Sequence, residues 1–121
     1  MDMERGFFNV NYKQYIIPAM FILFDIISGI LKAAYEGNMS SCAMRKGLFN
    51  KLGEILALML GKLVEYASLQ YQLGFSIPLY TAIAAYLVLM ETLSILENIS
   101  AMNPAMGKFL SKFMKAHEWE E

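Results

Sequence analysis

The residues of this chain with the clearest chemical potential are carboxylates that interrupt long apolar runs. Asp25 is the only charged residue between Lys13 and Lys32, and Glu91 is the only one between positions 78 and 96. A charged side chain is costly inside a bilayer, so each carboxylate should face other protein or water. Such residues are typical of ion pairing, a water-lined path or proton transfer.

A second set of polar residues recurs along one face of a helix that we expect between about Leu48 and Gly74. Read in alternating steps of three and four, that face carries only small or polar side chains. They are Asn50, Glu54, Ala57, Gly61, Glu65, Ser68 and Gln72. Lys62 lies three residues before Glu65, so the two charges partly neutralise each other. The pattern predicts a pore or oligomer face that includes Lys62, with a helix lying on the membrane surface or a soluble helical hairpin as alternatives.

The two other apolar runs carry shorter polar faces. Ser28, Gly29 and Lys32 share a helical face with Asp25, and Ser94 and Asn98 share one with Glu91. The predicted intramembrane polar residues are Asp25, Gly29, Glu91, Ser94 and Asn98. We expect Glu91 to pair with a polar group on the second helix, while Asp25 has either a functional role or a structural buried hydrogen bond.

Residue types that support catalysis or metal binding are scarce. Cys42 is the single cysteine and His117 the single histidine, so the sequence offers no internal disulfide, zinc cluster or thiol–histidine pair. A formal net charge of −1 argues against a nucleic-acid partner, because a phosphate backbone requires a basic excess. We therefore expect no enzyme activity, no catalytic residue, no metal and no cofactor.

The composition predicts an all-α membrane protein. Of the 121 residues, 57% are hydrophobic and 17% charged, against about 45–50% and about 25% in an average soluble domain. A helix of about 20 residues crosses a hydrocarbon core of about 30 Å, which predicts transmembrane helices at about 12–32, 52–74 and 76–98. An amphipathic helix at 105–117 follows, and residues 1–121 are expected to form one oligomeric membrane domain.

The first and second spans should be joined by a connector from Ala33 to Asn50, with Ser40 or Ser41 capping the next helix. The cytoplasmic basic loop is predicted to comprise Arg45, Lys46 and Lys51. Because basic loops remain in the cytoplasm, we expect the N-terminus outside and the C-terminus inside.

Three further features bear on this topology. Residues 1–13 are rich in aromatic side chains that suit a membrane interface, and Trp119 is expected to anchor the amphipathic helix at the inner leaflet. Pro18 lies in the first turns of the first span, where a missing backbone N–H should cost little.

Three segments, taken together and in order, resemble a known family. They are Phe24–Ala33, the Ser40–Ser41 pair followed by Met44–Leu48 and Lys51, and Glu91–Asn98. With these segments the chain resembles a phage holin of the toxin-secretion/phage-lysis type, over roughly residues 20–110.

This resemblance implies a non-enzymatic protein of the bacterial inner membrane that forms homo-oligomers. Its lesions would release an endolysin, or in relatives a toxin, from the cytoplasm without necessarily contacting it. An antiholin or another accessory subunit of a membrane complex is the alternative, and a small ion or proton carrier is a lesser one.

Overall fold

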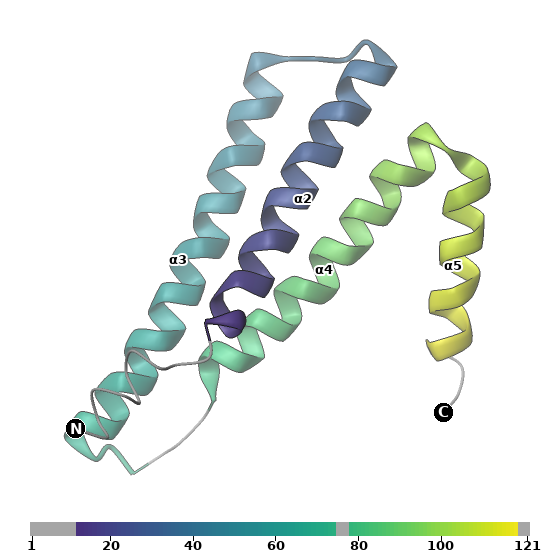
Figure 1. The fold of residues 1–121 in the computed structure, drawn as a ribbon. Coiled ribbons are helices and arrows are strands. Elements are labelled where there is room, and N and C mark those ends of the chain that lie inside the picture. Colours follow the sequence, from purple (N-terminus) through teal and green to yellow (C-terminus); the bar gives the residue numbers. More distant parts are fainter. Residues whose placement is uncertain (1–11, 75–77, 119–121) are drawn as a thin grey trace.

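The computed structural model describes residues 12–74 and 78–118, and these residues form helices joined by short links, with no strand among them (Figure 1). The helices are α2 (Lys13–Glu36), α3 (Ser41–Tyr71), α4 (Leu79–Met102) and α5 (Pro104–Glu118). The all-α prediction is therefore confirmed. The expected aromatic arm at residues 1–13 falls almost entirely outside the described residues, as does Trp119.

The link between α2 and α3 is much shorter than predicted. Gly37 ends α2 in the left-handed conformation (φ 69°), and its N–H donates to Ala34 O at 3.2 Å. Ser40 caps α3 and its Oγ accepts from Ala43 N–H at 3.3 Å. The predicted connector from Ala33 to Asn50 is wrong, because the stop and start signals lie three residues apart and the basic segment after them favours helix.

Pro18 has a larger structural consequence than its position near the start of α2 predicts. A residue with an N–H at position 18 would donate to Gln14 O, four residues earlier, and proline removes this hydrogen bond. The hydroxyl of Tyr80 on α4 donates to that carbonyl oxygen at 2.7 Å instead. The lost bond is replaced by a contact that ties the first turns of α2 and α4 together.

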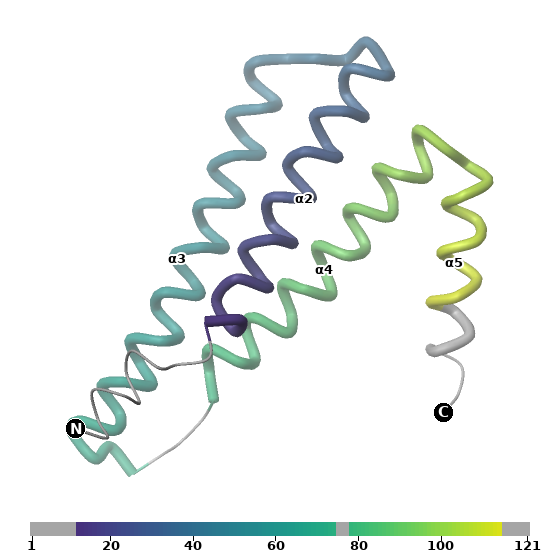
Figure 2. Tube along the Cα trace, viewed as in Figure 1, coloured from purple at the N-terminus to yellow at the C-terminus, as the bar shows by residue number. Residues whose placement is uncertain are grey.

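Helix α4 is the centre of the bundle, since it packs against α2, α3 and α5. Figure 2 follows the chain along α3 and back along α4, whose first turns lie beside those of α2, where the Tyr15 and Tyr80 rings are 5.4 Å apart. Direct packing between α2 and α3 is slight. The buried apolar core is correspondingly small and consists of Ile22, Leu58, Tyr80 and Leu87.

Most large apolar side chains point outward, as expected of a protein surrounded by lipid. Two helices, α2 and α4, are long and apolar enough to cross a membrane. Helix α3 is longer and has an apolar outer face, on which Leu63 is 66% and Leu69 77% exposed. It also carries four charged residues after Asn50. That α3 crosses as a third span stays a prediction.

Helix α5 lies close to its predicted range and folds back on α4. Gly107 is buried, and a Cβ there would lie 2.8 Å from the Cα of Ser100, so only glycine permits this approach. The side chains of Phe109 and Phe113 contact each other and are exposed. They form the apolar face that the amphipathic pattern predicts.

Candidate functional site: an ionic cluster shared by three helices

The ammonium group of Lys51 lies at the junction of α2, α3 and α4. It contacts both carboxylate oxygens of Glu91, at 2.6 and 2.7 Å, and pairs with the Asp25 carboxylate on α2. Glu54, one turn further along α3, lies 3.5 Å away. One lysine therefore holds carboxylates from all three helices, and we call Asp25, Lys51, Glu54 and Glu91 the ionic cluster.

Neutral polar groups complete the cluster on its α2–α4 side. Asn98 donates from Nδ2 to Asp25 Oδ1 at 3.2 Å and to Ser28 Oγ at 2.9 Å. The Ser28 hydroxyl in turn donates to the backbone oxygen of Asp25 at 3.2 Å. Hydrogen bonding of this kind is what makes a buried polar network tolerable in an apolar bundle.

The charges of the ionic cluster do not balance. Three carboxylates surround one ammonium group, and Glu54 Oε2 is buried without a hydrogen-bond partner. Like charges repel strongly where water is scarce, so the packing of three helices depends on Lys51. The cluster links three helices and contains more carboxyl groups than cations.

A small cavity leads to the ionic cluster from the α2–α3 link. Its volume is about 310 Å³, and Asn38 and Ser40 line it on the side of the link. Asp25, Lys51, Ser94 and Asn98 also line it. The cluster is thus buried among helices yet approached by a partly polar opening from one end of the bundle.

Four of the five predicted intramembrane polar residues meet here. Asp25, Glu91 and Asn98 are buried partners in the network, and Ser94 lines the cavity. Gly29 lies beside them, since a Cβ on it would be 3.7 Å from Asn98 Nδ2. The expected pairing of Glu91 with the second helix is confirmed, with Lys51 as its partner.

The three residues assigned to a cytoplasmic basic loop all lie in α3. Arg45 and Lys46 are exposed in its first turns. Lys51 was wrongly placed, because its side chain is only 12% exposed and belongs to the ionic cluster. A signal for this was available: Lys51 lies three residues before Glu54 and ten before Gly61, and so lies on the same helical face as the polar stripe of α3.

The polar stripe of α3 faces α4 within the same chain. A Cβ on Gly61 would lie 3.2 Å from Tyr80 Cα and 3.3 Å from Tyr80 N, so the two helices touch through their backbones. Glu65 Oε1 accepts from Tyr80 N–H at 2.9 Å, which satisfies one of the free amides at the start of α4. Ser68 is buried and donates to Glu65 O at 2.8 Å. A single chain therefore satisfies part of this stripe through its own α4.

The remaining members of the stripe are less enclosed. Ala57 is half-buried, and Gln72 is exposed at the end of α3 with a φ of 50°. The expected pairing of Lys62 with Glu65 is confirmed at 3.6 Å. Whether these residues line a pore or an oligomer interface stays a prediction.

The carboxylates of the ionic cluster are not arranged as a metal site. In the part of the chain that the structure describes, no group of three or more His, Cys, Asp or Glu residues is arranged to hold a metal ion. Lys51 itself fills the space between the carboxylates. The geometry is that of helix-to-helix ion pairing within an apolar shell.

Residues 7–118 match the model of the bacteriophage holin family. The chain belongs to the bacteriophage holin family. No match was found among curated proteins or among solved structures. The match confirms the resemblance that the three sequence segments indicated. It supports the conclusion that this holin is a membrane protein of phage lysis.

Proposed function

We propose that this holin oligomerises in the bacterial inner membrane and opens lesions through which an endolysin, or a toxin, leaves the cytoplasm. The observation that carries the proposal is the family match over residues 7–118. The distribution of side chains supports it, because the charged groups of the ionic cluster lie inside the bundle while leucines and aromatic residues cover much of its outside. That arrangement suits a protein that must remain in a bilayer before it assembles.

The topology that we propose has three spans, with the N-terminus outside and the C-terminus in the cytoplasm. The α2–α3 link is then cytoplasmic, with exposed Arg45 and Lys46 beside it. The lysines of α5, at positions 108, 112 and 115, are on the same side. Both groups follow the positive-inside rule.

The single chain is then the closed form of the subunit. Its α3 stripe is occupied by α4 through the Gly61–Tyr80 contact and the Glu65–Tyr80 hydrogen bond. For Glu54, Gly61 and Glu65 to line a lumen, α3 must leave α4 and exchange these contacts for others. Water in a lumen, or a second copy, would then take over their hydrogen bonds.

The test is inducible expression in a bacterium together with a cytoplasmic murein hydrolase that has no export signal. Culture turbidity and membrane potential are followed through time. Abrupt lysis that requires both proteins would support release of a folded enzyme. Loss of potential without lysis would instead indicate a small channel, and would contradict the proposal.

The contacts between α4 and the polar stripe of α3 within one chain also favour a second candidate, an antiholin or another accessory subunit. A subunit that already engages several members of this stripe within one chain, at Gly61, Glu65 and Ser68, has less need of self-association. This candidate predicts that expression alone is harmless at confirmed membrane levels. It also predicts that a stable partner protein copurifies with the chain.

A further inference from the structure

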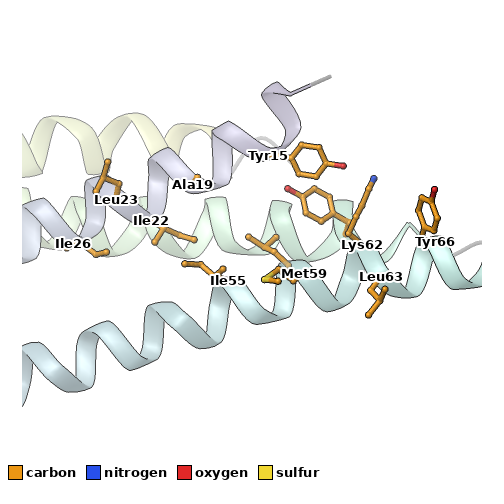
Figure 3. A pocket seen from close by; sticks show the side chains of 12 residues that line it. Tyr15, Ala19, Ile22, Leu23, Ile26, Ile55, Met59, Lys62, Leu63 and Tyr66 are labelled. Carbon is orange, nitrogen blue, oxygen red and sulfur yellow. The ribbon is translucent and has the colours of Figure 1, made fainter. Parts of the chain in front are cut away.

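An apolar groove of about 860 Å³ runs between α2 and α3, two helices that pack little directly against each other (Figure 3). Its walls include Ile22 and Leu23 from α2 and Ile55 and Met59 from α3, and Tyr80 of α4 also lines it. Leu23 is 56% and Met59 62% exposed, so the groove is open along its outer side. The volume lies within the usual range for a bound small molecule, about 300–1,000 Å³.

Polar character appears only at one end of this groove. There the Lys62 ammonium group lies 5.6 Å from the ring centre of Tyr15 and 5.4 Å from that of Tyr80. Tyr66 also lines the groove here, and Figure 3 shows Tyr15 and Tyr66 at the same end of the groove as Lys62. Tyrosine and lysine together are typical of the level of lipid headgroups.

The length of the groove corresponds to one leaflet. On α2 its lining runs from Tyr15 to Ile26, and on α3 from Ile55 to Tyr66. Each stretch rises about 16 Å at 1.5 Å per residue. Half of a hydrocarbon core is about 15 Å, so the apolar end lies near mid-membrane when Tyr15 and Tyr66 lie at the interface. The long side chain of Lys62 extends toward that level, where its ammonium group approaches the Tyr15 ring.

We propose that this groove binds one anionic phospholipid. One acyl chain lies between α2 and α3 and reaches toward Ile26 and Ile55, and the phosphate lies beside Lys62. The Lys62 ammonium group pairs with Glu65 Oε2 at 3.6 Å, which is longer than a hydrogen bond, while Glu65 Oε1 accepts from Tyr80 N–H. The Lys62 side chain is 36% exposed, which leaves its ammonium group accessible for a phosphate oxygen.

Charge complementarity favours a lipid over a second copy of this chain. Among residues whose side chains the structure describes, the exposed carboxylates are those of Glu36 and Glu97. Glu36 ends α2, and Glu97 lies 17 residues after Tyr80 on α4, so both are far along their helices from Lys62. A copy inserted in the same orientation would bring neither of them to the level of Lys62.

The experiment uses the full chain in liposomes with a photoreactive phosphatidylglycerol that carries its reactive group midway along one acyl chain. Phosphatidylcholine with the same chains and reactive group serves as the zwitterionic comparison. After irradiation, labelled positions are mapped by peptide mass spectrometry. We expect Leu23 and Met59 to be labelled several-fold more than Leu89, which is 63% exposed on α4 outside the groove.

Two matched pairs of variants test the chain and the headgroup separately. Ala19→Phe fills the groove and should abolish its preferential labelling, whereas Ala82→Phe adds the same side chain at an exposed position of α4 outside it. Lys62→Gln should remove the preference for phosphatidylglycerol but retain chain labelling. Lys46→Gln, an exposed lysine of the same helix, should retain both.

Equal labelling of Met59 and Leu89 in the parent chain would overturn the proposal, because it would indicate only the surrounding bilayer. Unchanged labelling in a helical Ala19→Phe variant would also overturn it. Protection of Leu23 and Met59 from lipid, with cross-links between copies at these positions, would assign the groove to a second chain instead.

Circular dichroism checks that each variant is folded. If Ala19→Phe does not fold, the comparison of Lys62→Gln with Lys46→Gln still tests the proposal. Since lipid labelling is measured without lysis, these outcomes are separate from those that test lesion formation.

Discussion

Helix α3 is joined to the rest of the bundle by two contacts of opposite character. At Lys51 one ammonium group pairs with carboxylates from α2 and α4, and three helices meet through charge. Ten residues later, Gly61 meets the backbone of Tyr80, and two helices meet because a side chain is absent. The first contact is lost by removing atoms and the second by adding them. Variants at these two sites can therefore separate the stability of the three-helix bundle from the ease with which α3 leaves α4.

The largest effect should come from Lys51→Met. It leaves three carboxylates close together without their cation, and breaking a buried ion pair from one side costs about 3–5 kcal/mol. Unfolding in mixed detergent micelles, followed by circular dichroism, measures the loss. Lys46→Met, at an exposed site of the same helix, should change stability little. Equal losses of stability in the two variants would mean that the ion pairs of the ionic cluster do not stabilise the bundle.

Gly61→Leu should loosen α3 from α4 with a smaller loss of stability. A Cβ there would already lie 3.0 Å from Ile83 Cδ1 and 3.2 Å from Tyr80 Cα, and overpacking of this kind costs about 1–3 kcal/mol. If the single chain is the closed form, lysis in the murein-hydrolase assay should begin earlier. Gly53→Leu is the control, because its Cβ would have no neighbour within 4 Å. Later lysis in Gly61→Leu than in Gly53→Leu would contradict the closed-form interpretation.

Replacing Glu65 tests the hydrogen bond at the start of α4. Glu65→Leu leaves Tyr80 N–H without its acceptor, and we expect a cost of about 1–2 kcal/mol because the site is partly buried. Glu65→Gln retains an acceptor oxygen and should lose less. We further expect Glu65→Leu to insert into the membrane but to stop lesion formation. Lysis at the parent time in that variant would argue against a pore role for this residue.

The smallest effect should be that of Tyr80→Phe, which removes the hydroxyl that donates to Gln14 O. The expected loss is about 1 kcal/mol, while Tyr86→Phe, at an exposed ring, should be neutral. In a Pro18→Ala background the new N–H of residue 18 can donate to Gln14 O, so Tyr80→Phe should cost less there. A double-mutant cycle measures this difference. Full additivity of the two changes would show that Tyr80 does not compensate for the proline.

The local pattern was enough to predict the helices and much of the polar interior. The apolar runs around Asp25 and Glu91 predicted α2 and α4, since only a helix satisfies its own backbone in lipid. The ends of α2 and α3 were predicted less well. Gly37 and Ser40 are local stop and start signals. The positive charge of the residues after Ser40 favours a cytoplasmic loop, but their helix propensity continues α3 through them.

Sequence alone thus determined the family, the helical class and which residues are too polar for lipid. Spacing along one helix specifies a face, but not which other helix covers it. Only the tertiary structure decided that α4 covers the Gly61 stripe and that Lys51 is an interior cation. The reason is that these contacts join residues far apart in the chain, such as Lys51 and Glu91, and no periodicity within one helix records the partner on another.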